Sequence, residues 1–262
     1  MNILDELAAY AAVRVAKAKT IKSLNQVRQE AEQLPQGNFP FARALQKEGL
    51  AFICECKKAS PSKGLIAENF PYLQIAKDYE QAGADCISVL TEPKWFLGSN
   101  KYLAEIASKV KIPCLRKDFT VDPYMIYEAK LLGASAVLLI CGISTDTQIK
   151  EYLKICDSVG LSALVEAHDA TEIKRAVEDG AKIIGVNNRN LKNFSVDVNN
   201  SAKLRALVPK NILYISESGI KTPEDVRAVK NMGADGVLIG EALMRSKNIT
   251  AALQRLKGGA DD

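Results

Sequence analysis

Acidic and basic side chains recur at the ends of short apolar runs along this sequence. Glu55 is the last residue but one of the run AFICEC, and Lys57 follows that run. Lys117 follows KIPCLR, and Glu166 is the last residue of LSALVE. Lysines and carboxylates are the groups that act as general acids and bases in proton transfer. In an extended segment Glu55 and Lys57 lie on the same face, so they can form an ion pair. We therefore expect an acid-base site assembled from distant parts of the chain.

Further polar residues stand at the ends of the other runs. One charged residue after a strand is usually a solvated loop residue. Here, however, polar residues stand at the ends of seven of the apolar runs. An inward-facing set of ion pairs without a function would cost desolvation for little stability, which favours chemistry over structure. The additional candidates are Glu92, Asp118, Asn187, Arg189, Glu217, Ser218, Gly240 and Glu241.

Eight apolar runs must position these residues. They are rich in Val, Ile and Leu without alternation, as expected of parallel strands buried on both faces. The segments between them are long enough for a crossover helix each time. The runs span residues 51–56, 85–90, 111–116, 135–140, 161–166, 182–187, 212–216 and 235–240.

A Gly-Ala pair precedes every second run, at Gly83, Gly133, Gly180 and Gly233. Each glycine fits the C-terminal cap of a helix. The repeat predicts an α/β protein with a (β/α)8 TIM barrel, because closure removes both sheet edges. Its catalytic residues would lie at the C-terminal ends of the strands. The alternative is a doubly wound open sheet, but the sequence lacks the Gly-x-Gly-x-x-Gly pattern of dinucleotide-binding members of that class.

The first fifty residues show helical rather than strand spacing. We expect helices near residues 2–17, 23–34 and 41–50, as an extension to a barrel over residues 51–257. The whole chain, 1–262, would form a single domain. The helix over 2–17 either covers the open end of the barrel, the interpretation we favour, or binds a partner.

Composition restricts the function further. The 35 Lys and Arg against 31 Asp and Glu give a net charge of +4, too small to predict a nucleic-acid partner. No apolar run is long enough to span a membrane. The six cysteines are typical of free thiols in a reducing compartment, and a chain with one histidine, His168, has few metal ligands. We expect a cytoplasmic monomer without metal, with His168 in a loop or capping role.

Two late segments suggest a phosphorylated small-molecule ligand. Residues 216–220 and 239–244 follow the seventh and eighth runs, where such barrels bind phosphate on backbone N–H groups and a short extra helix. The segment 59–64, rich in Ser, Pro and Lys, is either a mobile lid over an anion or an ordinary turn.

The motifs, taken together, resemble those of indole-3-glycerol-phosphate synthases. The resemblance covers residues 50–245, and an N-terminal helical extension is also expected in that family. The matching segments are Glu55-Cys56-Lys57-Lys58-Ala59-Ser60-Pro61-Ser62, Leu90-Thr91-Glu92 with Phe96 and Gly98-Ser99, Arg116-Lys117-Asp118-Phe119, Leu164-Val165-Glu166 with His168, Asn187-Asn188-Arg189 and Ser216-Glu217-Ser218-Gly219-Ile220.

The resemblance implies a reaction without metal or organic cofactor. It would close the indole ring of 1-(2-carboxyphenylamino)-1-deoxyribulose 5-phosphate with loss of carbon dioxide and water, in tryptophan biosynthesis. Lys117 would be the general acid and Glu166 the general base. We expect neighbouring cations to lower the pKa of Lys117, and an apolar ring to raise that of Glu166.

The resemblance also implies the other roles. Lys57, oriented by Glu55, would engage the substrate carboxylate or act as an acid, Asn187 would hold the substrate, and Arg189 would brace the site beside Glu217. Glu241 stands where the family can use a serine, so a backbone contact to phosphate is expected there. The implied catalytic residues are Glu55, Lys57, Lys117, Glu166, Asn187, Glu217 and Ser218, and the implied substrate-binding residues are Ser60, Arg189, Gly219, Gly240 and Glu241.

Two other classes compete with this interpretation. Another phosphate-binding barrel, such as an isomerase or a Schiff-base aldolase using Lys57 or Lys117 as nucleophile, would place similar residues at its mouth. A binding protein on a barrel that has lost its activity is also compatible with the fold. The charges retained at the strand ends argue against the second class.

Overall fold

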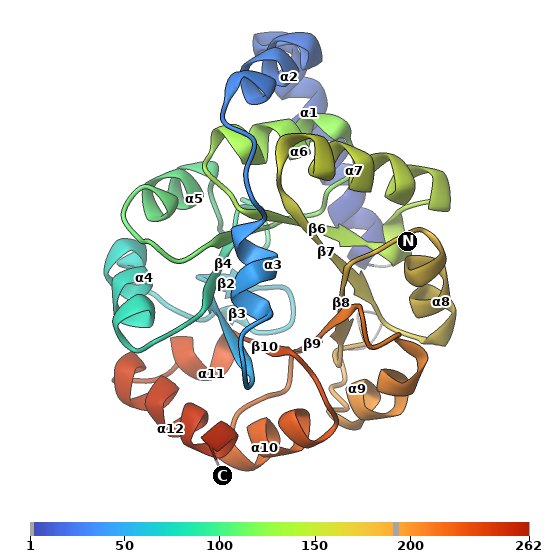
Figure 1. Ribbon diagram of the computed structural model, residues 1–262. Helices are drawn as coiled ribbons and strands as arrows, with labels where there is room; N and C mark the ends of the chain where they lie inside the picture. Colours follow the sequence, from blue (N-terminus) through green and yellow to red (C-terminus); the bar gives the residue numbers. More distant parts are fainter. Residues whose placement is uncertain (1–2, 191–193, 262) are drawn as a thin grey trace.

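Eight parallel strands close into a barrel in the computed structural model, which describes residues 3–190 and 194–261 (Figure 1). The strands neighbour one another in chain order, and β1 pairs with both β4 and β10 to complete the ring. This confirms the predicted TIM barrel. The barrel strands are β1 (Ala51–Cys56), β4 (Cys86–Leu90), β5 (Cys114–Lys117), β6 (Ala136–Ile140), β7 (Ser162–Ala167), β8 (Ile183–Asn187), β9 (Leu213–Glu217) and β10 (Gly236–Ile239).

Helices surround the barrel and cover its outer face (Figure 1). After each of the first seven strands the chain returns through one or more of them, which is the crossover that parallel pairing demands. The helices after β1 are α4 (Tyr72–Gln81), α5 (Asn100–Ala107), α6 (Pro123–Leu131), α7 (Asp146–Val159), α8 (Ala170–Glu178), α9 (Asn199–Leu204), α10 (Pro223–Asn231), α11 (Glu241–Met244) and α12 (Ile249–Asp261), with short 3-10 turns η1 (Cys141–Ile143) and η2 (Arg205–Leu207).

The four Gly-Ala pairs end helices as predicted. Gly83, Gly133, Gly180 and Gly233 all have positive φ, between 79° and 93°. Glycine adopts this left-handed conformation without a steric penalty, so only two residues separate each glycine from the next strand. The repeat seen in the sequence is therefore a repeat of the helix-to-strand turn.

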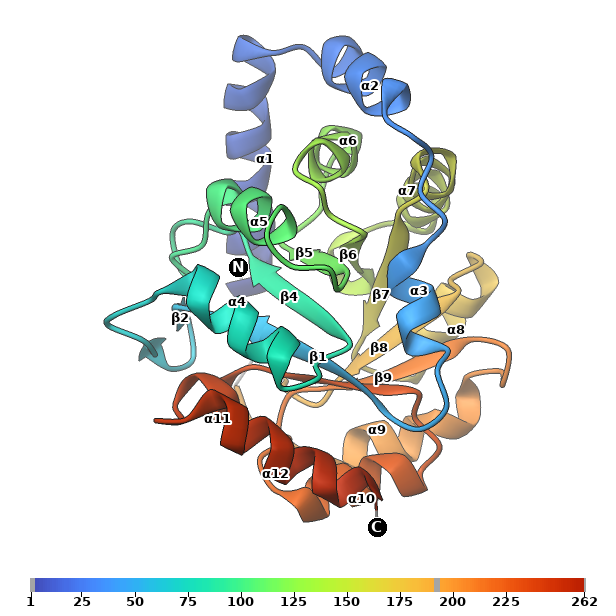
Figure 2. The same ribbon diagram turned by 60° about the vertical axis from the view of Figure 1, so that its left-hand side comes forward.

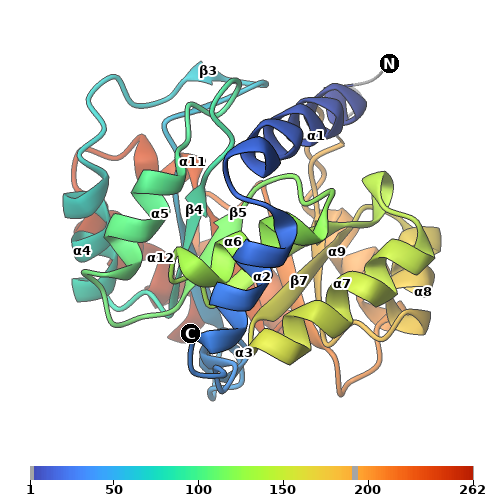
Figure 3. The same ribbon diagram turned by 90° about the horizontal axis from the view of Figure 1, so that it is seen from above.

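The N-terminal helices lie at both ends of the barrel. They are α1 (Ile3–Ile21), α2 (Leu24–Gln33) and α3 (Pro40–Leu45). Figures 2 and 3 show α1 beside the end where the short hairpin of β2 (Ala59–Ser60) and β3 (Gly64–Leu65) lies, whereas α3 lies at the opposite end. Phe41 and Leu45 of α3 are fully buried and join the cluster that fills the barrel. The extension thus holds the barrel at two places.

The differences from the predicted elements are local. The third strand begins at Cys114 rather than at 111, because Pro113 has no N–H to donate to a ladder. The third helix ends at Leu45 rather than at 50, and the first continues to Ile21. The β2–β3 hairpin in the predicted lid was not foreseen. None of the described helices is long and apolar enough to cross a membrane.

Candidate functional site

Strand alternation brings the predicted residues to one cavity. Alternate residues of each strand point into the barrel, and the inward series starts with apolar residues that fill the interior. The next inward position along the strand then carries a polar group at the mouth. The pairs are Ile53 and Glu55, Leu115 and Lys117, Leu164 and Glu166, and Ile215 and Glu217.

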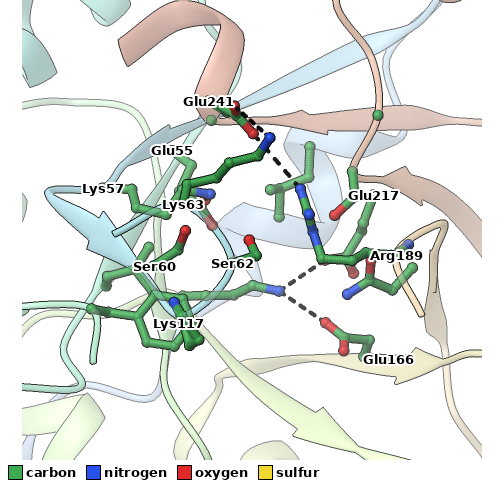
Figure 4. Close-up of a pocket in the computed structure, with 18 of the residues that line it drawn as sticks. Glu55, Lys57, Ser60, Ser62, Lys63, Lys117, Glu166, Arg189, Glu217 and Glu241 are labelled. Atoms are coloured by element: carbon green, nitrogen blue, oxygen red, sulfur yellow. Dashed lines mark hydrogen bonds and ion pairs between the residues drawn. The ribbon is translucent and has the colours of Figure 1, made fainter. Parts of the chain in front are cut away.

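Lys117 lies at the centre of the mouth between two carboxylates. Its Nζ donates to Glu166 Oε2 at 3.0 Å and to Glu217 Oε2 at 2.8 Å (Figure 4). All three side chains are almost completely shielded from solvent. Interactions between charges are stronger in such a site than in water, so the protonation of each group depends on the other two.

The protonation directions differ from those predicted for two of these residues. Burial alone lowers the pKa of Lys117, but the carboxylates of Glu166, Glu217 and Glu55 outweigh it and raise the pKa above its usual value. Burial raises the pKa of Glu166, whereas Lys117 and then His168 lower it, and the net direction is down. Both expectations were wrong, because the sequence could not show that the lysine faces carboxylates and that Glu166 faces cations.

Glu217 is the group at the mouth that titrates near neutrality. Burial, opposed by Lys117 and reinforced by Glu166, raises its pKa to about 7. Two carboxylates that share one ammonium cannot both be fully compensated. The mouth therefore holds a charged lysine, an ionised Glu166 and a Glu217 that gains or loses a proton readily.

Gly185 makes room for this arrangement and was missed by the sequence analysis. A Cβ at this position of β8 would lie 2.0 Å from Glu217 Oε1. No other residue type fits unless the carboxylate moves away. A glycine inside an otherwise apolar strand is the signal that could have found it, since such glycines mark close approach.

Lys57 and Glu55 form the ion pair that the spacing predicted. Lys57 Nζ donates to Glu55 Oε1 at 2.5 Å, and Glu55 is buried. A Cβ at Gly240 would lie 2.5 Å from the same oxygen and 3.1 Å from Lys57 Nζ. Gly240 is thus needed to accommodate this pair, whatever it contributes to a ligand.

The two predicted phosphate segments meet at the mouth. Ser218 and Gly219, after β9, both have positive φ, 67° and 89°, and Gly240 directly precedes α11. A non-glycine residue with positive φ is uncommon and often marks a functional turn. Ser218, Gly219 and Gly240 line the same cavity as Lys57, Lys117 and Glu166, as the sequence predicted.

Glu241 and Arg189 are arranged differently from the expectation. The Glu241 carboxylate lies 3.6 Å from Lys63 Nζ of the hairpin loop and 3.7 Å from Arg189 (Figure 4). It also lies 3.3 Å from Arg245. Arg189 was expected to brace the site beside Glu217, but its ionic partner among the described contacts is Glu241. The carboxylate is neutralised by cations, which reduces its repulsion of an anionic ligand nearby.

The remaining predicted residues divide between the site and its support. Ser60 is buried and lines the cavity, and the side chain of Asn187 accepts from Arg189 N at 3.0 Å. Glu92 instead accepts three backbone N–H groups of its own loop. Asp118 accepts both Arg14 amino groups of α1 and the hydroxyl of Thr91. Glu92 and Asp118 are therefore structural.

One side of the cavity is apolar. Ile3 and Leu7 of α1 line it together with Phe96 and Phe119. The two phenyl rings lie with their centroids 6.0 Å apart. None of these four residues was predicted from the sequence to belong to the site. The mouth thus combines an apolar wall with buried acid-base groups, a composition typical of sites for small molecules.

The six cysteines are free and buried, as predicted. Burial raises the pKa of Cys54, Cys56, Cys86 and Cys114, so these thiols resist ionisation. Within the described part of the chain, no three His, Cys, Asp or Glu side chains are placed to hold a metal ion.

Solved structures share the fold at low sequence identity. The chain superposes on KGPDC from Streptococcus mutans with a TM-score of 0.63 at 12% identity, over 82% of this chain and 98% of the other. Thiamine phosphate pyrophosphorylase from Pyrococcus furiosus gives a TM-score of 0.61 at 15% identity, over 81% and 95% of the two chains. At these identities the likeness concerns the barrel fold alone.

Sequence relatives are much closer. An indole-3-glycerol phosphate synthase of Ruminiclostridium cellulolyticum is 56% identical over 98% of this chain and 100% of its own length. The protein of the same name from Lacticaseibacillus paracasei is 54% identical over 93% and 94% of the two chains. The family model described as indole-3-glycerol phosphate synthase matches residues 4–256. With the barrel and its acid-base mouth in place, these matches show that the chain belongs to the indole-3-glycerol phosphate synthase family, a family of carboxy-lyases.

Proposed function

We propose that the protein closes the indole ring of 1-(2-carboxyphenylamino)-1-deoxyribulose 5-phosphate, releasing carbon dioxide and water to give indole-3-glycerol phosphate. One observation carries this proposal: the Lys117 ammonium lies between Glu166 and Glu217 in a cavity with one apolar wall. A charged donor beside ionisable carboxylates suits a reaction that needs proton transfers in both directions.

Lys117 acts as the general acid that protonates the ketone oxygen while the aromatic ring carbon attacks. Its raised pKa keeps it charged until that oxygen becomes basic. Glu166, ionised at neutral pH, is the base of the later dehydration. Glu217 shares the Lys117 ammonium with Glu166. When Glu217 is protonated, the positive charge of Lys117 balances the negative charge of Glu166.

Lys57 pairs with the substrate carboxylate until carbon dioxide leaves, and Glu55 holds its ammonium in place. Backbone N–H groups near Ser218, Gly219 and Gly240 receive the phosphate, because positive-φ turns and helix N-termini present such groups to anions. The aromatic part of the substrate packs against Phe96 and Phe119. Ser60, Asn187, Arg189 and the backbone of Glu241 complete the contacts.

The direct test mixes purified protein with the carboxyphenylamino-deoxyribulose phosphate in the absence of added metal. We expect carbon dioxide and the fluorescent indole product to appear together, in equimolar amounts. Borohydride added during turnover should trap no substrate on Lys57 or Lys117. A covalent lysine adduct would replace this proposal with an aldolase-type mechanism. Carbon dioxide without an indole product would contradict the proposed ring closure.

Four further properties of the protein are predicted together with this reaction. These are independence of metal and organic cofactors, a monomeric state, a cytoplasmic location, and a single domain over residues 1–262. Removal of metal ions by a chelator should leave the rate unchanged, and sedimentation at assay concentration should give the mass of one chain, 28.5 kDa.

A further inference from the structure

His168 lies directly behind the proposed base. It follows β7 two residues after Glu166 and precedes α8, and its side chain is about one-fifth exposed. Glu172, from the first turn of α8, holds it twice: Glu172 Oε2 accepts the His168 backbone N–H at 2.8 Å and lies 3.1 Å from ring Nδ1. The ring therefore has a fixed orientation.

The other ring nitrogen faces Glu166. His168 Nε2 lies 3.4 Å from Glu166 Oε1, whereas the second oxygen of that carboxylate, Oε2, accepts from Lys117. Nε2 is shielded from solvent and has no hydrogen bond among the described residues. A buried polar nitrogen without a hydrogen-bond partner costs free energy. The position of Nε2 beside the Glu166 carboxylate therefore suggests that the two groups interact.

We propose that His168 is a positioning residue for Glu166: from the side opposite Lys117, its ring bridges the Glu166 carboxylate to Glu172 and holds it in its ionised form. The inference rests on the proposed function in so far as Glu166 is taken to be the base. Carboxylate-histidine-carboxylate bridges of this kind fix both ring orientation and protonation state.

The charges around the ring agree with this role. Three carboxylates act on the ring, Glu166 from β7, Glu172 from α8 and Glu217 from β9. Burial lowers the pKa of His168, but the hydrogen bond to Glu172 and the negative charges of these carboxylates outweigh it and raise the pKa. A protonated ring carries a hydrogen on both nitrogens, so that Nε2 then faces Glu166 Oε1 with a positive charge at 3.4 Å.

The His168 ring also lines a second cavity, which Asn187 lines as well. Its charged lining residues are His168, Asp169, Glu172, Arg189 and Asp197. The Asp169 side chain caps the N-terminus of α8. Asp197 pairs with Lys203 and makes no contact with the ring among the described interactions. Asp197 is therefore a suitable control, since it adds charge to the same cavity without touching His168.

The single histidine makes the first experiment unambiguous. In protein labelled with 15N-histidine, His168 alone gives ring signals, and their pH titration reports its pKa. We expect that pKa to fall in both Glu166→Gln and Glu172→Gln and to stay within experimental error in Asp197→Asn. An unchanged titration in Glu166→Gln would overturn the proposed bridge, whether or not the protein is active.

The second experiment asks whether the bridge matters for turnover. In His168→Gln, which keeps a donor but removes the charge, we expect kcat to fall about 10-fold, the typical value of one charge-assisted hydrogen bond. The acidic limb of the kcat profile should move to higher pH, because Glu166 is protonated more readily without the imidazolium. KM should change less than about twofold, as expected when substrate binding is untouched.

A merely structural histidine would lower kcat equally at every pH, and that result would overturn the inference. Urea unfolding of the variant separates lost stability from lost positioning. If the wild-type protein fails to turn over the substrate, the proposed function fails, while the 15N titration still decides whether Glu166 and His168 are coupled.

Discussion

The two ends of the barrel use their charged groups in opposite ways. At the end closed by α3, Asp85 and Asp235 accept the backbone N–H groups of Phe52 and Tyr214 at 2.8 and 2.7 Å. At the mouth, one oxygen each of Glu166 and Glu217 accepts from the Lys117 ammonium. One end uses carboxylates to fix the chain, and the other keeps them available.

The contrast shows where this fold contains interactions that reduce its stability. The closed end is filled by apolar side chains such as Phe41, and its half-buried acids accept backbone N–H groups, which is how a stable structure treats polar groups that lose water. The mouth buries acids close enough to compete for one proton, an arrangement that desolvation makes costly. Substitutions at the mouth should therefore change rate, and substitutions at the closed end should change stability.

The largest effect is expected for Lys117→Ala. Loss of the proposed general acid should lower kcat by about 10²- to 10⁴-fold, measured by indole fluorescence, with the fold retained. The matched control is Lys47→Ala at the closed end, where the ammonium pairs with Asp85 at 2.8 Å. Near-normal turnover by Lys117→Ala would remove the lysine from the mechanism and weaken the contrast between the ends.

Phe41→Ala tests the closed end itself. The side chain is fully buried, so its removal should reduce the free energy of unfolding by about 3–5 kcal/mol, measured in urea. At temperatures where the variant is folded, kcat should equal that of the wild type. A large loss of kcat in the folded variant would mean that the two ends are coupled.

Gly185→Ala tests the difference between the two ends of the barrel by adding a single methyl group at the mouth. Its Cβ would lie 2.0 Å from Glu217 Oε1, so the carboxylate must shift and kcat should fall roughly 10- to 100-fold. The control is Gly236→Ala at the other end, where the Cβ would meet Ile215 Cδ1 at 3.0 Å and Ala51 O at 3.1 Å. That variant should lose stability alone, and equal kcat losses in both would contradict the assignment.

The smallest effect concerns pH and stability. Because the pKa of Glu217 is raised from 4.5 to about 7, the folded protein keeps a proton that the unfolded chain has lost in this range. The free energy of unfolding should therefore fall as pH rises from about 4.5 to about 7, by up to about 3 kcal/mol. Glu217→Gln should remove this slope, whereas Phe41→Ala should keep it. A slope unchanged in Glu217→Gln would assign it to other groups.

The sequence was informative wherever one residue type serves one local purpose. The apolar runs predicted eight strands, and the Gly-Ala pairs predicted the turns before them, because strand burial and left-handed turns are local properties. The inward positions followed from alternation, which is why Lys57, Lys117 and Glu166 were predicted to share a cavity and do line one.

Partners across the barrel could not be predicted in the same way. Glu92 and Asp118 stand at strand ends like the site residues, yet they bind backbone or Arg14. Glu166 and Glu172 are near His168 in sequence, but whether its ring faces them depends on how α8 packs beside β7. The sequence therefore determined the barrel and which side chains reach its mouth. Only the tertiary structure decided the protonation of those groups, since charges close in space, rather than in sequence, set each pKa.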